Sequence, residues 1–128
     1  MPSRADHPDA PIHEIKADLF KALGHPVRVR VLELLAPGER AVSDLLAETG
    51  LEASLLSQHL AVLRRTRVVA ARREGNGVTY RITHPSVGEM LTAARTFLVS
   101  TLTETRDTLD DLQQRLDREN AAPTVGPR

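Results

Sequence analysis

The sequence contains no cysteine among its 128 residues, and aromatic residues make up only 2% of it. The missing thiols exclude disulfides, thiolate metal sites and cysteine nucleophiles. The three aromatic residues, Phe20, Phe97 and Tyr80, are too few to build a core. We therefore expect the interior to consist of Leu, Val and Ala.

Long apolar runs are also missing, since none approaches the roughly 18 residues that a membrane-spanning helix requires. The first 25 residues carry prolines and charges but no apolar block of the kind found in signal peptides. We expect a cytoplasmic protein. The length fits one domain, which we place at 12–120 between flexible tails at 1–11 and 121–128.

The formal net charge is zero, yet the charges are unevenly distributed. The segment 51–85 holds six arginines and two glutamates, which gives +4, whereas 86–120 holds four arginines and seven acidic residues, which gives −3. A local basic patch matters more for phosphate binding than the total charge does. The middle of the chain is therefore the candidate for nucleic-acid contact.

Apolar residues at helical spacing predict a first helix over 12–23, and a second from Pro26 to about Ala36 with Val27, Val31, Leu34 and Leu35 buried. We expect Ser43 to cap a short third helix that ends at Gly50, and Ser54 to cap a fourth over about 55–66. Leu56, Leu60 and Leu63 form the apolar stripe of that fourth helix. Two short helices joined in this way are typical of a helix-turn-helix.

Two strands, 68–74 and 78–83, are predicted around Gly75-Asn76-Gly77, which suits a tight hairpin turn. In the second strand, Val78, Tyr80 and Ile82 should face one side and Arg81 the other. The hairpin carries Arg72, Arg73 and Arg81 directly after the fourth helix. It has the character of a basic wing.

Pro85 and Ser86 open a last helix that continues to about Asn120. Its leucines recur every seven residues, and the helix is too long to cover its apolar stripe on so small a domain. This period predicts packing against a second copy of the chain. The dimer interface that we expect, on the first and last helices, consists of Leu19, Leu91, Leu98, Leu102, Leu109, Leu112 and Leu116.

Three stretches in this order, LFKALGHPVRVRVLELL (19–35), SDLLAETGLEASLLSQHLAVLRR (43–65) and ARREGNGVTYRI (71–82), resemble the ArsR/SmtB winged-helix repressors. The resemblance covers about residues 12–116. It implies a mainly α, winged helix-turn-helix fold and a homodimer. The homodimer is expected to bind double-stranded operator DNA and to release it when an inducer binds. The expected function is that of a sequence-specific transcriptional repressor without enzymatic activity.

The sequence departs from the family pattern at two points. Arg67 stands between the fourth helix and the wing, where relatives usually carry glycine, and a left-handed conformation there costs arginine some energy. The residues that usually form the family's metal sites are also missing from this sequence. There is no cysteine on the third helix, and Arg95 follows His84 at the spacing where a second ligand would stand.

The expected DNA contacts lie at the start of the fourth helix and on the wing. Gln58 can pair with adenine, serine and histidine can reach base edges, and arginines can bind phosphates. For His59 and Tyr80, packing in the core is the alternative, and Arg28 is expected to be a structural partner. The full set is Ser54, Ser57, Gln58, His59, Arg64, Arg65, Arg72, Arg73, Asn76, Tyr80 and Arg81.

Two further hypotheses stay open. In the first, His7, His13 and Glu14 bind nickel, cobalt or zinc through nitrogen and oxygen atoms, or a partner subunit performs the sensing. In the second, the long acidic helix makes the chain a protein–protein adaptor. His25, in Gly-His-Pro, is expected to be a turn residue.

Overall fold

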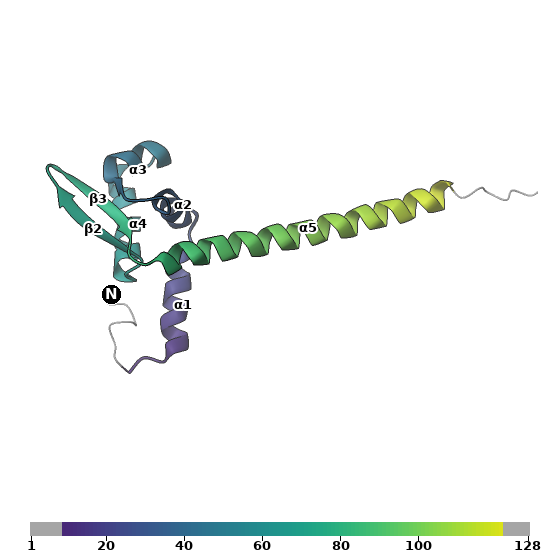
Figure 1. The fold of residues 1–128 in the computed structure, drawn as a ribbon, viewed down its shortest axis with the longest axis horizontal. Helices are drawn as coiled ribbons and strands as arrows, with labels where there is room; N and C mark the ends of the chain where they lie inside the picture. The colour runs from purple at the N-terminus through teal and green to yellow at the C-terminus, as the bar shows by residue number, and fades with distance from the viewer. Residues whose placement is uncertain (1–8, 122–128) are drawn as a thin grey trace, which may run out of the picture. The chain divides into compact units, whose positions relative to one another are not determined.

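A computed structural model of the chain describes residues 9–121. The elements follow in the order α1 (Ile12–Leu23), α2 (Pro26–Leu35), β1 (Arg40–Ala41), α3 (Val42–Thr49), α4 (Ala53–Arg65), β2 (Val69–Glu74), β3 (Gly77–Ile82) and α5 (Pro85–Ala121) (Figure 1). The predicted order of four helices, a hairpin and a long last helix is confirmed. The chain divides into two compact units, 1–91 and 92–128. The predicted tails fall mostly outside the described residues.

Apart from Tyr80, the hydrophobic core of the first unit is aliphatic, as predicted. Its largest fully buried side chains come from α2, α3 and α4: Val31, Leu32, Leu35, Leu45, Leu56, Leu60 and Leu63. The stripe predicted on α4 is confirmed. On α2 the prediction missed Leu32, whereas Val27 and Leu34 are only partly buried.

The predicted N-caps of α3 and α4 were wrong. Ala41 and Glu52 occupy the N-cap positions of α3 and α4, and neither side chain caps the helix. Each helix therefore begins before its serine, so that Ser43 and Ser54 lie in the first turn. Gly50 does close α3, in the left-handed conformation at φ 67°.

Strands β2 and β3 form the wing, with Glu74 paired to Gly77 across a two-residue turn. Sequence reasoning missed β1, which pairs with β3 through Arg40 and Ala41. A strand of two residues has no periodicity to detect. It ties the start of α3 to the wing and makes a three-stranded sheet in the order β1-β3-β2.

Arg67 adopts the left-handed conformation that its place in the sequence suggested, with φ 63°. Its N–H donates to the carbonyl of Arg64 at 2.9 Å, and the N–H of Val68 donates to that of Leu63 at 3.2 Å. These two bonds are those of a Schellman motif at the end of α4. The motif turns the chain from α4 into the wing, at the cost of an arginine with positive φ.

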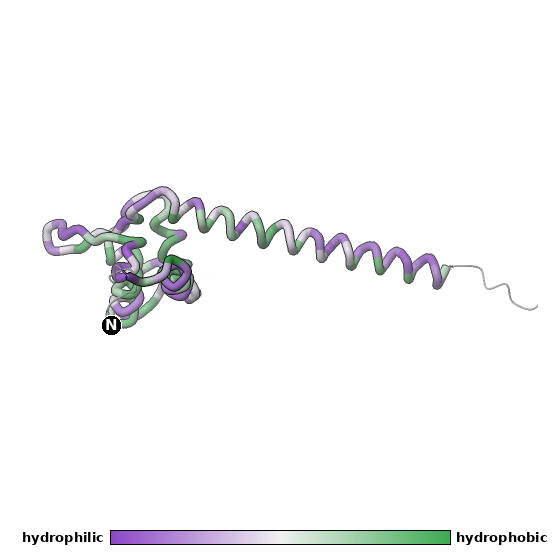
Figure 2. The backbone as a smooth tube through the Cα atoms, turned by 90° about the horizontal axis from the view of Figure 1, so that it is seen from below, coloured by the Kyte–Doolittle hydropathy of each residue, from purple (hydrophilic) through white to green (hydrophobic). Residues whose placement is uncertain are grey.

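The second unit consists of residues 92–121 of α5. Hydrophobic and hydrophilic segments alternate along this helix (Figure 2). Phe97, Leu98, Val99, Leu102, Leu109, Leu112 and Leu116 are each about half exposed or more. Within residues 9–121, no helix combines the length and the apolar character that crossing a bilayer requires.

Candidate DNA-binding surface

One face of α4 is buried and the other is open. Leu56, Leu60 and Leu63 lie in the core. Ser54, Ser57 and Gln58 are exposed on the N-terminal half, and Arg64 and Arg65 on the last turn. Because the spacing of three and four residues places the two serines and Gln58 on one side of the helix, they form a continuous polar face. This face has the hydrogen-bonding groups that read base edges.

His59 does not belong to that face. Its side chain is 8% exposed, and its ring centroid lies 4.4 Å from that of His25. Its Nδ1 lies 3.3 Å from an Nη1 of Arg28. Burial lowers the pKa of His59, and the neighbouring His25 and Arg28 lower it further. The structure thus favours the packed alternative, and we remove His59 from the expected DNA contacts.

Arg28 joins three helices, in agreement with its predicted structural role. Its Nε donates to the carbonyl of Ala22 at 2.6 Å and its Nη2 to that of Lys21 at 3.3 Å, so it satisfies the last turn of α1. The same guanidinium contacts His59 on α4. His25 caps α2, since its Nδ1 accepts from the N–H of Val27 at 3.1 Å. The expectation of a turn residue is confirmed.

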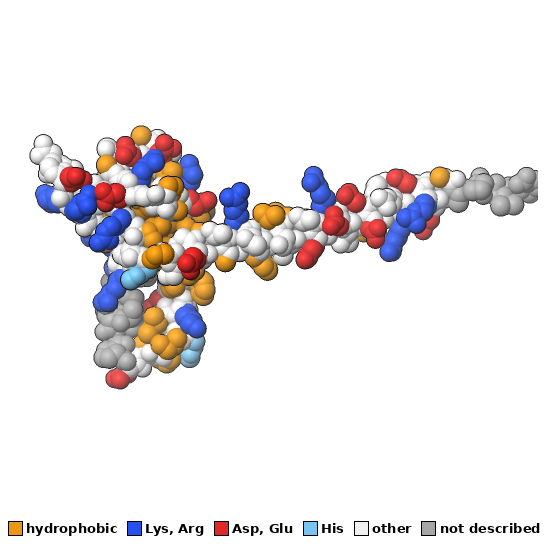
Figure 3. All heavy atoms as spheres, in the orientation of Figure 1, with side chains coloured by type: hydrophobic (Ala, Val, Ile, Leu, Met, Phe, Trp, Pro, Cys, Tyr) orange, Lys and Arg blue, Asp and Glu red, His pale blue; other side chains and the backbone are white. Residues whose placement is uncertain are grey.

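The wing presents arginines on both of its faces. The strand register pairs Arg72 with Thr79 and Ala70 with Arg81, which puts Arg72 and Arg81 on the same face. Arg73 pairs with Val78 and so lies on the other face. All three arginines are exposed. Figure 3 shows basic side chains gathered at the wing, with acidic ones among them.

Arg72 differs from the other two arginines because it is already paired. Its Nη2 donates to Glu39 Oε1 at 2.8 Å and to Glu74 Oε2 at 3.2 Å. The hydrogen bonds to these carboxylates raise the pKa of Arg72. Within residues 9–121, no salt bridge involves Arg73 or Arg81. Among the three wing arginines, Arg73 and Arg81 therefore carry the charge that no salt bridge within the described residues engages.

Tyr80 and Asn76 have different positions on the wing. Tyr80 is 7% exposed and belongs to the hydrophobic core, together with Val69 of the neighbouring strand. The burial of Tyr80 favours the alternative in which its ring packs in the core, and a DNA contact through Tyr80 stays an untested prediction. Asn76 is exposed in the turn at the wing tip.

The expected interface leucines fall into two groups. Leu98, Leu102, Leu109, Leu112 and Leu116 are exposed, whereas Leu19 and Leu91 pack partly against the core of the first unit. Two apolar side chains of α1, Ile12 and Phe20, are 65% and 63% exposed. Phe20 is one of the apolar residues at helical spacing that predict α1. Its exposure makes it an interface candidate that the sequence pattern did not reveal.

Two of the three residues of the proposed metal site, His13 and Glu14, lie within the described residues. His7 lies outside the described residues. His13 and Glu14 are neighbours on α1. Among residues 9–121 no three histidine or acidic side chains come close enough together to hold an ion. Binding of nickel, cobalt or zinc by His7, His13 and Glu14 stays a prediction.

Comparisons with known proteins agree with this architecture. Residues 25–71 match the family described as bacterial regulatory protein, arsR family. The HTH-type transcriptional regulator Rv0081 of Mycobacterium tuberculosis is 48% identical over 104 residues, which cover 80% of this chain and 91% of the relative. Its crystal structure aligns with a TM-score of 0.70 at 49% identity, over 74% of this chain and 96% of that one.

A homodimeric winged helix-turn-helix DNA-binding domain from Mycobacterium bovis, solved by NMR, aligns with a TM-score of 0.65 at 33% identity, over 72% of this chain and 85% of that one. The transcriptional repressor BigR from Xylella fastidiosa aligns with a TM-score of 0.60 at 33% identity, over 73% of this chain and 88% of that one. The arrangement of α4 and the wing is the one that these regulators share. The chain belongs to the arsR family of bacterial regulatory proteins, and it is a winged helix-turn-helix transcriptional regulator rather than an enzyme.

Proposed function

We propose that the chain is a homodimeric repressor that binds operator DNA with the exposed face of α4 and with the wing, and that an effector modulates this binding. The observation that carries the proposal is the division of α4 into a buried leucine face and an exposed face with Ser54, Ser57 and Gln58. The similarity to BigR, which is named a transcriptional repressor, supports repression as the direction of control.

The second unit supports a homodimer. Its exposed leucines repeat every seven residues, which suits two helices packed along one seam. Thr101 and Thr105, which lie beside these leucines, do not carry free hydroxyl donors. Thr101 donates to the carbonyl of Leu98 at 3.0 Å and Thr105 to that of Thr101 at 2.9 Å. Their hydroxyl donors are satisfied within the helix, so little desolvation opposes burial of this face.

In such a dimer, two α4 helices about 34–36 Å apart would enter successive major grooves of a near-palindromic site. Gln58 would pair with a base, and Ser54 and Ser57 would contact base edges or phosphates. Arg64, Arg72, Arg73 and Arg81 would bind phosphates, and Asn76 would reach the minor groove from the wing tip. Arg65 is left out of this set, because it lines a pocket that faces α1.

The test is a measurement of DNA affinity as a function of salt, on a duplex selected from genomic DNA. The change of Arg73 and Arg81 together to Ala should weaken binding at least about tenfold and lower the salt slope by about 2, since each phosphate contact contributes about 0.9. Gln58→Ala should instead change the preferred sequence. Arg118→Ala, an exposed arginine of α5, is the matched control and should leave the affinity unchanged.

A second variant tests the paired state of Arg72. Glu39→Gln removes the carboxylate at 2.8 Å and should raise DNA affinity about twofold to fivefold, because Arg72 no longer has to exchange this partner for a phosphate. Equal salt slopes for all these variants, together with an unchanged sequence preference in Gln58→Ala, would contradict the proposed surface.

A further inference from the structure

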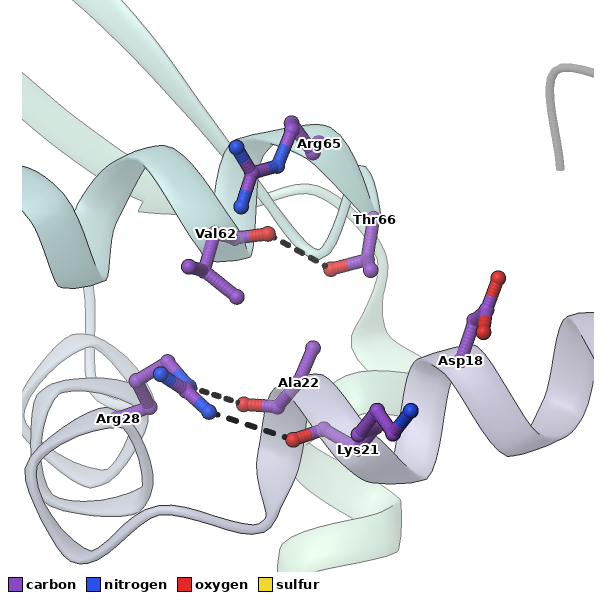
Figure 4. A pocket seen from close by; sticks show the side chains of 7 residues that line it. All are labelled: Asp18, Lys21, Ala22, Arg28, Val62, Arg65 and Thr66. Atoms are coloured by element: carbon purple, nitrogen blue, oxygen red, sulfur yellow. Dashed lines mark hydrogen bonds between the residues drawn. The ribbon is translucent and has the colours of Figure 1, made fainter. Parts of the chain in front are cut away.

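A pocket of about 320 Å³ lies between α1 and the last turns of α4. Its residues come from three helices: Asp18, Lys21 and Ala22 of α1, Arg28 of α2, and Val62, Arg65 and Thr66 at the end of α4 (Figure 4). The volume is at the lower end of the range for small-molecule sites. The pocket is thus large enough for a small organic molecule.

The lining combines cations with an apolar surface. Lys21, Arg28 and Arg65 contribute three positive charges and Asp18 one negative charge. None of the salt bridges within residues 9–121 involves any of these three cations. Ala22 and Val62 supply aliphatic surface between them (Figure 4). This charge balance favours an anion, and the aliphatic part favours one with a compact apolar body.

The pocket also connects to the DNA-reading helix in two ways. Arg65 belongs to α4 itself. Arg28 holds the last carbonyls of α1 with Nε and Nη2, and its Nη1 contacts the buried His59 of α4. An anion that draws on these guanidiniums changes the contacts on which α4 rests. A ligand bound here can therefore favour one position of α4 over another.

We infer that this pocket binds a small organic monoanion, a carboxylate on a compact apolar body, and that its occupation changes the DNA affinity of the chain. The inference deepens the proposed function by naming the class of effector and its site. Lys21 and Arg65 bind the carboxylate, Ala22 and Val62 contact the apolar body, and Arg28 connects the ligand to His59.

The experiment is an NMR titration of the ¹⁵N-labelled full chain with sodium benzoate at constant ionic strength. The amide signals of Ala22, Val62 and Thr66 should shift and saturate, with a Kd on the order of 1 mM. Lys21→Gln combined with Arg65→Gln should raise the Kd at least about tenfold. Both side chains are exposed, so the remaining spectrum should stay that of the wild type.

Two controls make the result specific. Lys16→Gln combined with Arg30→Gln removes the same charge from exposed positions outside the pocket and should leave the Kd unchanged. Benzyl alcohol, which has a similar apolar body without the charge, should bind at least about tenfold more weakly. No saturation up to about 50 mM benzoate, equal binding of benzyl alcohol, or an unchanged Kd in the pocket variant would overturn the site.

The regulatory part is tested separately, by the DNA affinity of the wild type with and without saturating benzoate. A change of at least about threefold is expected, and it should be absent in the pocket variant. Equal affinities in the wild type would overturn the link to α4 while leaving the site intact. Because the titration contains no DNA, failure of the chain to bind DNA would contradict the proposed function alone.

Discussion

The two units of the chain use the same residue type in opposite ways. In the first unit Leu56, Leu60 and Leu63 of α4 are at most 2% exposed, whereas Leu102 and Leu109 of α5 are 67% and 59% exposed. Both helices carry leucines at helical spacing. The difference is that α1, α2 and β2 pack against α4, while residues 92–121 bring no second element of their own.

An amphipathic pattern therefore identifies the face of a helix that will be buried but not the partner that buries it. In the first unit the partner is within the same chain, so burial does not depend on protein concentration. In the second unit, residues 92–121 contain no other element to serve as partner, and in the proposed dimer a second copy of the chain supplies it.

The largest effect is expected in the core of the first unit. Leu63→Ala removes a fully buried side chain and should lower the free energy of unfolding by about 2–5 kcal/mol. Chemical denaturation at several protein concentrations measures this loss, which should be the same at each. A loss of less than about 1 kcal/mol would show that Leu63 packs loosely.

The next effect concerns the second unit. Leu102→Asp combined with Leu109→Asp places charges on the exposed leucine seam and should raise the dimer dissociation constant at least about a hundredfold, while the first unit stays folded. Sedimentation velocity at micromolar concentration measures it. Thr103→Asp with Gln114→Asp adds the same charges on the outer side of the helix and serves as the control. Equal sedimentation of both variants would contradict the seam.

A smaller effect distinguishes a strained position from an ordinary helical one in the first unit. Arg67→Gly relieves the positive φ of 63° and should stabilise the chain by about 1 kcal/mol. Arg64→Gly, three residues earlier in α4, should instead destabilise it by about 0.5–1 kcal/mol, because glycine is a poor helix former. Thermal unfolding checks both, and a destabilised Arg67→Gly variant would refute the argument.

The smallest effect is a pH dependence confined to the first unit, since residues 92–121 contain no histidine. The pKa of His59 lies below its unfolded value of 6.5, because burial and the adjacent His25 and Arg28 disfavour the imidazolium. Below pH 6.5 the unfolded chain takes up a proton more readily than the folded one. The contribution of neutral His59 to the free energy of unfolding is therefore complete above pH 6.5, and it decreases as the pH falls below that value.

Comparison of unfolding at pH 7.5 and 5.5 measures this loss. His59→Gln should show a smaller decrease in stability than the wild type, and His84→Gln, at an exposed histidine, should behave as the wild type does. An identical pH dependence in all three proteins would assign the effect to other groups.

Much of the fold follows from local patterns. The bounds of α1 and α5, the wing and the leucine stripe of α4 were all predicted, because helical spacing, glycine turns and alternation are encoded within a few residues. The remainder depends on tertiary contacts. β1 exists only because β3 lies beside it, and Phe20 is exposed because nothing in its own unit covers it.

The candidate site followed the same rule. Ser54, Ser57 and Gln58 are exposed as expected, since the polar face of an amphipathic helix is a local property. His59 and Tyr80 were assigned to DNA because polar residues beside a recognition-type helix and on a wing are common contacts. Their burial depends on Arg28 and on the core, which are distant in sequence. The pairing of Arg72 with Glu39, 33 residues away, was equally hidden.

The contacts of Arg72 with Glu39 and Glu74 also bear on the thermodynamics of the wing. These two carboxylates act as built-in counterions, so Arg72 need not recruit any from solvent. When Arg72 exchanges them for a phosphate, cations leave the polyanion, but the freed carboxylates attract cations in turn, so the net release is smaller than three arginines would suggest. Counting basic residues near the duplex would thus overstate how steeply binding falls as electrolyte is added.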